Sequence, residues 1–227
     1  MLPRRLEPEV MDTEQDAHDY DAMDHSAVNR LFVDDLLTFA TGWLDWASPI
    51  LDVGTGPAHI PIELCRRVPQ CRVVAVDLAQ HMLTLAQRNL QAAGISQQVQ
   101  LVRTNARALA LAEASFALVI SNSIIHHIPQ PRDCIAELVR VTRPGGGLFV
   151  RDLLRPTSYE ELDRLVDLHA AGANAHQRQL FADSLHAALT VDEMRQLVAE
   201  FGFDPGSVAV TSDRHWTWAA RKPGGAA

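Results

Sequence analysis

The chain has 227 residues, 47% of them hydrophobic and 21% charged, which is typical of one globular domain with a buried core. A net charge of -8 argues against broad attraction to nucleic acid, so no nucleic-acid partner is expected. No apolar stretch has the length of a membrane span or the pattern of a signal peptide, and the three cysteines form no Cys-x-x-Cys pair. We therefore expect a cytoplasmic protein without a membrane partner.

The N-terminal part is predicted to contain a tail followed by a lid. Residues 1–17 are acidic, polar and aperiodic, which predicts a flexible tail. Residues 18–47 carry apolar side chains at helical spacing and are predicted to form a helical lid over a bound cofactor. Tyr20 precedes the regular pattern and is the preferred lid contact. For Phe32, which lies within the pattern, ordinary packing is the preferred interpretation.

From residue 48 onward, apolar runs alternate with helical patterns, which predicts a largely parallel sheet with right-handed crossovers and helices on both faces. The last third predicts a helical insertion at about residues 155–190 on the substrate side, then a further helix and two final strands, and residues 48–227 are taken as one domain. The expected strands are 50–53, 72–76, 99–102, 117–121, 148–150, 208–210 and 215–219. The predicted fold is therefore α/β, with a doubly wound, seven-stranded, mostly parallel sheet and a C-terminal antiparallel strand.

Glycines and carboxylates follow the first two strands. Gly54 and Gly56 come directly after the first strand, where they permit a sharp turn and close approach of a ligand. Asp77 closes the second strand, where a carboxylate can accept hydrogen bonds from ribose hydroxyls, the interpretation we favour, or cap the helix starting at Ala79. Since ligands bind beyond the carboxyl ends of strands in such sheets, these residues should converge on one crevice.

Asp52 discriminates between candidate cofactors. It lies two residues before Gly54, where its carboxylate would repel the pyrophosphate of a dinucleotide but attract the ammonium and sulfonium groups of S-adenosylmethionine. The third glycine of the dinucleotide fingerprint is also missing, because GTGPAH carries Ala58 and His59 there. Both observations disfavour a nicotinamide cofactor.

Five stretches resemble class I S-adenosylmethionine-dependent methyltransferases of the small-molecule type, over about residues 48–152: ILDVGTGPAHIPIEL, VVAVDLAQHMLTLAQ, VRTNARAL, SNSIIHHIPQP and ELVRVTRPGGGLFVRD. The resemblance implies a Rossmann-like sheet and a bound S-adenosylmethionine. It departs from the family pattern at Ala58, a frequent glycine, and at Asn105, a common aspartate. The implied cofactor residues are Asp52, Gly54, Thr55 and Gly56 for the methionine part, Asp77 for the ribose, Leu78 and Met82 for the adenine face, Asn105 and Ala106 for its edge, Ser121 and Asn122 near the methionine end, and Tyr20 from the lid.

The resemblance also places histidines beside the acceptor. His127 is the first candidate for a general base or an orienting group, Asp152 is the second, and His126 is adjacent. The alternative for the histidines is a polar role that fixes the loop, and for Asp152 it is pairing with Arg155 or capping of the next helix. The other histidines and the cysteines form no ligand set, so no metal is expected.

These residues together predict methyl transfer to a small-molecule acceptor by in-line displacement, with S-adenosylhomocysteine as the second product. The alternatives are a non-catalytic S-adenosylmethionine-binding regulatory or partner protein, a nicotinamide-dependent oxidoreductase, and methylation of a macromolecule. A homodimer through the exposed side of the helical insertion is a further expectation. The sequence does not identify the acceptor.

Overall fold

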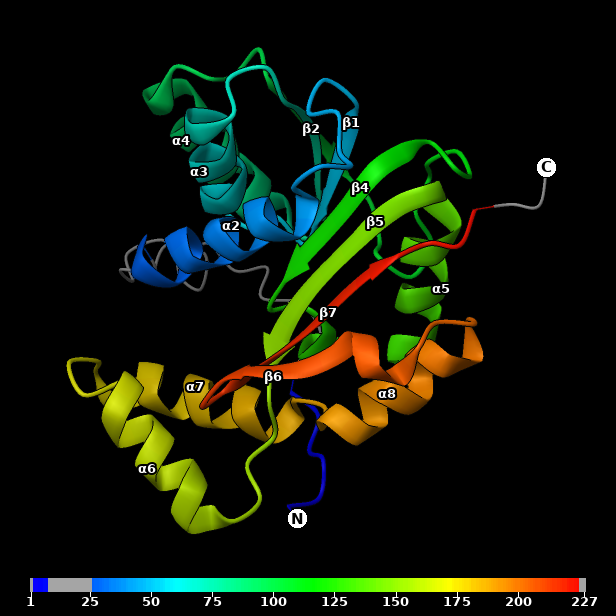
Figure 1. Cartoon of the computed structure of the whole chain (residues 1–227). Coiled ribbons are helices and arrows are strands. Elements are labelled where there is room, and N and C mark those ends of the chain that lie inside the picture. Colours follow the sequence, from blue (N-terminus) through cyan, green and yellow to red (C-terminus); the bar gives the residue numbers. More distant parts are fainter. Residues whose placement is uncertain (1, 8–25, 225–227) are drawn as a thin grey trace.

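The computed structural model describes residues 2–7 and 26–224, which form a seven-stranded sheet flanked by helices (Figure 1). The sheet order is β3-β2-β1-β4-β5-β7-β6, and only β7 runs antiparallel to its neighbours. The predicted fold class is confirmed. The strand order reverses between β1 and β4, where such sheets bind ligands. The strands are β1 Pro49–Val53, β2 Arg72–Asp77, β3 Val99–Arg103, β4 Phe116–Asn122, β5 Thr142–Leu153, β6 Val208–Ser212 and β7 His215–Arg221.

Two hydrophobic clusters cover the two faces of the sheet because successive strand residues point to opposite sides. Ile50 belongs to one cluster and its neighbour Leu51 to the other. Trp216 and Trp218, two residues apart on β7, share the second cluster, as their spacing predicts. The first face carries α2 Ser26–Ala40, α3 His59–Arg67 and α4 Gln80–Ala93, and the second carries α5 Pro131–Val141 and α8 Val191–Glu200 (Figure 1).

The range 155–190 contains two helices, α6 Tyr159–His169 and α7 Ala175–Ala187, which pack together below the sheet in Figure 1. Their third hydrophobic cluster also includes Leu2, which is 6% exposed. None of the helices in the described part of the chain is long and apolar enough to cross a membrane.

Residues 2–7, which the sequence analysis predicts to be part of a flexible tail, contact the body of the protein. The Arg4 guanidinium donates to the carbonyls of Ala187 (2.7 Å), Ile128 (2.9 Å), His126 (3.2 Å) and Pro129 (3.3 Å). The Arg5 N–H also donates to the carbonyl of His186, and the Ser184 hydroxyl donates to Glu7. None of these contacts creates a periodic pattern in the sequence. The rest of the predicted tail lies outside the described residues.

The fifth strand is longer than predicted. The sequence Pro144-Gly145-Gly146 indicates a loop before a strand at 148–150, but β5 already begins at Thr142. Phe116 of β4 pairs with Thr142, and the register then shifts so that Leu118 pairs with Gly147. The proline and glycines are therefore accommodated as an irregularity inside the strand.

Candidate functional site

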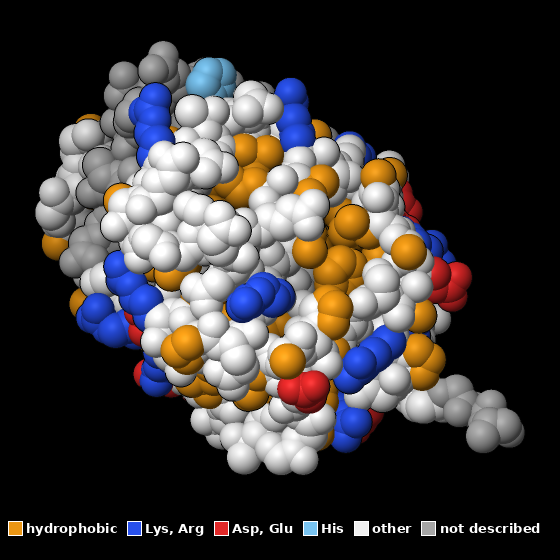
Figure 2. Space-filling view, turned by 90° about the horizontal axis from the view of Figure 1, so that it is seen from above, with side chains coloured by type: hydrophobic (Ala, Val, Ile, Leu, Met, Phe, Trp, Pro, Cys, Tyr) orange, Lys and Arg blue, Asp and Glu red, His pale blue; other side chains and the backbone are white. Residues whose placement is uncertain are grey.

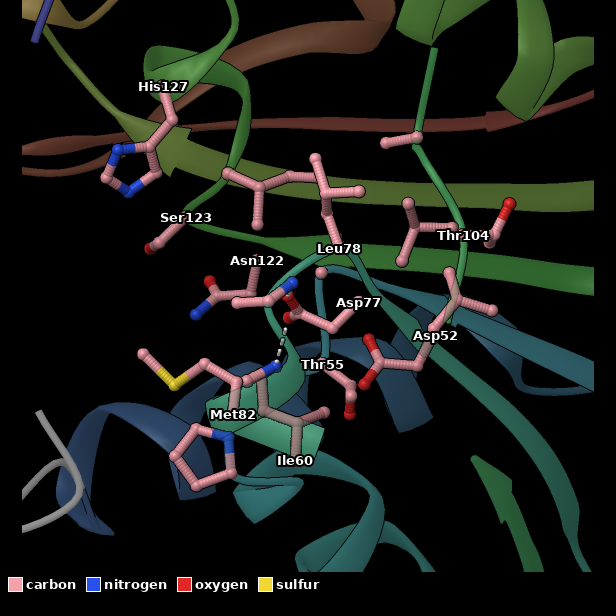
Figure 3. Close-up of a pocket in the computed structure, with 18 of the residues that line it drawn as sticks. Asp52, Thr55, Ile60, Asp77, Leu78, Met82, Thr104, Asn122, Ser123 and His127 are labelled. Carbon is pink, nitrogen blue, oxygen red and sulfur yellow. Dashed lines mark hydrogen bonds between the residues drawn. The ribbon is translucent and has the colours of Figure 1, made fainter. Parts of the chain in front are cut away.

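A cavity of about 160 Å³ lies beyond the carboxyl ends of β1 to β4 (Figure 3). The residues that line it come from the loops after all four strands and from α2, which contributes Asn29. The sequence-predicted residues in its wall are Asp52, Gly54, Thr55, Gly56, Asp77, Leu78, Met82, Asn105, Ala106, Asn122 and His127. Residues up to 75 positions apart in the sequence thus meet at the predicted crevice.

The glycine loop between β1 and α3 has a left-handed backbone at two of its residues. Gly54 has φ 76° and Gly56 has φ 52°. A Cβ on Gly54 would lie 2.1 Å from Cγ2 of Ile124, in the loop after β4, so this glycine is required by both conformation and space. Ala58 also has a positive φ, 65°, at the N-cap of α3. The alanine at the family's third glycine position therefore keeps a glycine-like backbone at a cost of about 1–2 kcal/mol.

Asp77 joins two loops through its carboxylate. Oδ2 accepts a hydrogen bond from the Gly56 N–H at 2.8 Å, and Oδ1 accepts one from the Ala79 N–H at 2.9 Å (Figure 3). The predicted alternative, a cap of the next helix, is not formed, since the N-cap of α4 is Ala79 and no side-chain hydrogen bond caps the helix. A carboxylate has about four acceptor positions, so two hydrogen bonds leave capacity for a ligand's hydroxyls.

Asp52 is a buried carboxylate with an unsatisfied oxygen. Its exposure is 2%, and Oδ2 has no hydrogen-bond partner among the described residues. Burial raises the pKa of Asp52 to about 7, and the nearby Thr55 hydroxyl offsets this only in part, while the charge of Asp77 adds to it. A cation supplied by a ligand would compensate this isolated carboxylate. The nearby Thr55 hydroxyl is also buried and unpartnered, so this end of the cavity is suited to a charged, hydrogen-bonding ligand such as the methionine part of S-adenosylmethionine.

The two predicted histidines have different surroundings. Both lie in η1 Ile125–His127 directly after β4, but only His127 lines the cavity. His126 is 3% exposed, and its Nδ1 lies 2.5 Å from Oδ1 of Asp152. Burial opposes both charges, yet each partner stabilises the other: the pKa of His126 is raised and that of Asp152 is lowered. Burial, with the charge of His126, lowers the pKa of His127.

Comparison with known proteins identifies the domain. Residues 50–146 match the family described as "Methyltransferase domain". Residues 50–146 therefore form a methyltransferase domain. The predicted family is thus confirmed, and S-adenosylmethionine, the predicted cofactor, is the cofactor of such domains.

Two curated relatives and one solved structure illustrate the likeness. The chain is 35% identical to a trans-aconitate 2-methyltransferase of Azoarcus sp. over 52% of its length and 43% of the relative's. It is 30% identical to the ubiquinone/menaquinone biosynthesis C-methyltransferase UbiE of Dinoroseobacter shibae over 47% of this chain and 45% of that one. The matched regions thus span less than half of these two relatives. A methyltransferase structure from Aquifex aeolicus has the same fold, with a TM-score of 0.68 at 17% identity, over 92% of this chain and 98% of that one.

Three predicted site residues of the methyltransferase domain lie outside the cavity wall. The Ser121 hydroxyl is fully buried and donates to the carbonyl of Val53, so it joins β4 to β1. Asp152 is 1% exposed, and its oxygens accept from His126 and from the N–H groups of Ile125 and Leu153. A carboxylate held in this way is not placed to take a proton from an acceptor. Asp152 and His126 instead form a buried pair behind η1.

The lid residues have mixed outcomes. Phe32 is 1% exposed and packs edge-on against Phe149, with ring centroids 5.2 Å apart, so the packing interpretation is confirmed. Asn29 lines the cavity from the same helix. Tyr20 lies outside the described residues, and its lid role stays a prediction. Asn105 uses its side-chain oxygen to accept from the Arg107 N–H at 2.9 Å, which holds the turn at the predicted adenine end.

Glu7 is the site residue that sequence reasoning missed. Its Oε1 lies 2.9 Å from Nδ1 of His127 and 3.5 Å from Nε2 of His126. The two histidines outweigh the effect of burial and lower the pKa of Glu7. No periodicity or motif distinguishes Glu7 in the acidic N-terminal segment, so only the folded chain brings it to the histidines.

Proposed function

We propose that the chain transfers the methyl group of S-adenosylmethionine to a small-molecule acceptor and releases S-adenosylhomocysteine. The observation that carries this proposal is the buried, unpartnered oxygen of Asp52 beside the glycine loop. S-adenosylmethionine supplies an already activated methyl group, so the protein's task is to bind and align the reactants.

The cavity residues divide into a cofactor part and an acceptor part. Asp52 and Thr55 would bind the ammonium and carboxylate of the methionine moiety, and Asp77 the ribose. Leu78 and Met82 would pack on the adenine, which Asn105 would meet at its edge. These assignments are supported by the shared cavity and by the order of the residues along β1, β2 and β3.

His127 is the proposed acceptor contact. Among the predicted catalytic residues, His127 lines the cavity, whereas His126 and Asp152 do not. The polar residues Asn122 and Ser123 line the cavity as well. Its ring can orient the acceptor. It can also take a proton from a hydroxyl acceptor or from the ammonium form of an amine acceptor. A thiolate or an activated carbon would need no base. The buried Asp152–His126 pair acts as a positioning element that fixes the loop bearing His127.

A small acceptor is supported by the surface charge as well as by the cavity. The chain is acidic overall, and on the face shown in Figure 2 the Lys and Arg side chains are separated from one another by uncharged surface, with a few Asp and Glu side chains among them. The two relatives described above carry the names of a trans-aconitate methyltransferase and a C-methyltransferase of ubiquinone/menaquinone biosynthesis. Their names differ in the acceptor, so they do not choose one for this chain.

The cofactor assignment is tested by calorimetric titration with S-adenosylmethionine, S-adenosylhomocysteine and NADH in parallel. We expect micromolar binding of the first two, weakened at least about ten-fold in Asp77→Ala because loop and ribose contacts are lost together. Asp204→Ala is the matched control, because Asp204 accepts from an N–H two residues ahead in an exposed turn, as Asp77 does. Binding of NADH alone would overturn the proposal.

Catalysis is tested with a panel of small acceptors bearing hydroxyl, amine, thiol, carboxylate and activated-carbon nucleophiles. Release of S-adenosylhomocysteine that requires both an acceptor and an intact Asp77 supports methyl transfer. Tight cofactor binding without release for any member of the panel favours the non-catalytic alternative.

A further inference from the structure

Three metal-ligating side chains meet beside the cavity, and His127 is the one of them that lines it. Glu7 comes from the N-terminal segment, and His126 and His127 come from η1. One potential ligand atom of each lies within 4.8 Å of the other two. We call these residues the Glu7–His126–His127 cluster.

The spacing of the cluster matches a coordination sphere. Two metal–ligand bonds of about 2.1 Å, at angles between octahedral and tetrahedral, place their ligand atoms about 3.0–3.4 Å apart. Oε1 of Glu7 lies 2.9 Å from Nδ1 of His127 and 3.5 Å from Nε2 of His126. The two separations that involve Glu7 are therefore close to those that a shared ion requires, and the ligand atoms of the two histidines lie within 4.8 Å of each other.

Hydrogen bonding does not account for the closest contact. Oε1 of Glu7 and Nδ1 of His127 are both buried, yet neither has a hydrogen-bond partner among the described residues. Their 2.9 Å separation is thus not aligned as a hydrogen bond. The Glu7 side chain is 9% exposed, so solvent contributes little to satisfying it. The two atoms are therefore held together by charge and without hydrogen-bond alignment, an arrangement in which both remain available to a bound ion.

Asp152 provides the supporting contact that metal-binding histidines commonly have. It lies 2.5 Å from Nδ1 of His126, and it is fixed in turn by the N–H groups of Ile125 and Leu153. In the neutral ring, with the proton on this side, Nε2 of His126 is free to bind an ion 3.5 Å from Oε1 of Glu7. The carboxylate thus fixes both the tautomer and the direction of the ring.

We propose that the Glu7–His126–His127 cluster binds one divalent transition-metal ion of the zinc type. Two imidazoles and one carboxylate favour such ions over magnesium or calcium, which prefer oxygen ligands. Three protein ligands leave a coordination position open, and an acceptor oxygen entering past His127 can occupy it. In the metal-bound protein His127 is a ligand, and its role as a base does not apply. Ion binding goes beyond the proposed methyl transfer and requires neither cofactor nor acceptor.

The test is a titration of the full chain, carrying no histidine tag and freed of metal with a chelator, with Co²⁺. We expect visible d–d absorption that saturates at one equivalent and is reversed by Zn²⁺. Glu7→Gln and His127→Ala should each weaken binding at least about ten-fold, and Asp152→Asn about 10–100-fold. His169→Ala is the matched control, because it removes an exposed histidine whose Nε2 lies 2.8 Å from Asp213.

If a variant misfolds, the unmodified chain alone decides the outcome. The proposal is overturned if Co²⁺ absorption of the unmodified chain fails to saturate at one equivalent. It is also overturned if binding is the same in wild type, Glu7→Gln and His127→Ala. Titration of each sample with S-adenosylhomocysteine monitors the cofactor site independently. A chain that binds Co²⁺ but no cofactor would contradict the proposed function and leave the metal site standing.

Discussion

The cofactor part and the acceptor part of the cavity are built differently. In the cofactor part, Asp77 binds the backbone of Gly56, 21 residues earlier, and both belong to motifs at the ends of adjacent strands. Beside His127, the proposed acceptor contact, Arg4 binds the carbonyl of His126, 122 residues later, and Glu7 reaches His127. The first part depends on backbone conformation, and the second depends on side chains from distant segments.

The largest expected effect tests the backbone requirement of the cofactor part. In Gly54→Ala, a left-handed alanine and a Cβ 2.1 Å from Ile124 should together cost about 3 kcal/mol and abolish binding of S-adenosylhomocysteine. Gly94→Ala is the control, since Gly94 has a similar φ of 72° but nothing within 4 Å of the added Cβ. It should cost only about 1–2 kcal/mol, the strain of a left-handed alanine, with no steric contribution. Chemical denaturation and calorimetry measure both effects, and equal losses in the two variants would contradict the steric argument.

The next effect tests whether side chains hold the acceptor part. Arg4→Ala removes hydrogen bonds to four carbonyls, including those of His126 and Ile128, and should lower the free energy of unfolding by about 1.5–3 kcal/mol. Arg5→Ala should change the free energy of unfolding by less than about 0.5 kcal/mol, because Arg5 is exposed. Its guanidinium donates to the hydroxyl of Tyr159, which is a surface contact. Urea denaturation of the two variants gives the comparison. Similar midpoints would mean that residues 2–7 are not held by Arg4.

The smallest expected effect sharpens the electrostatic difference between the two parts. The pKa of Asp52 is raised to about 7, and only the ionised carboxylate attracts the ammonium group of the ligand. Affinity for S-adenosylhomocysteine should therefore fall about ten-fold from about pH 8 to about pH 6. Asp52→Asn should bind more weakly at the higher pH and lose this dependence. Wild-type affinity that is constant, or that rises toward acid, would remove Asp52 from ammonium binding.

The same contrast explains what the sequence could predict. Strands, their order and the glycine loop follow from local periodicity and from residues such as Gly54 and Asp77, whose partners lie in neighbouring motifs. The direction of the Ser121 side chain is harder to predict from the sequence. Adjacent strand residues face opposite sides of the sheet, and only the pairing of β4 with β1 directs the Ser121 hydroxyl to Val53. The length of β5 was missed because a register shift absorbs Gly145 and Gly146. The roles of the cofactor residues, the lid and a homodimer stay predictions.

Glu7 lies beyond what pattern reasoning can reach. A carboxylate in an aperiodic acidic segment resembles any solvated charge, and a metal was not expected because the histidines alone offer no ligand set. Folding adds Glu7 to His126 and His127 by closing a loop of more than a hundred residues. The energy that selects this contact comes largely from elsewhere, through Leu2 and Arg4.

The attachment of residues 2–7 has a practical consequence for protein engineering. A tag fused ahead of Leu2 would be joined to a residue whose side chain is buried. It would also lie only five positions from Glu7, whose carboxylate contacts His127. At the other end of the chain, β7 ends at Arg221, and the Lys222 ammonium binds the carbonyls of Val139 and Thr142 near α5, remote from the N-terminus (Figure 1). Affinity handles, fluorophores and surface-immobilisation linkers therefore belong at the carboxyl end.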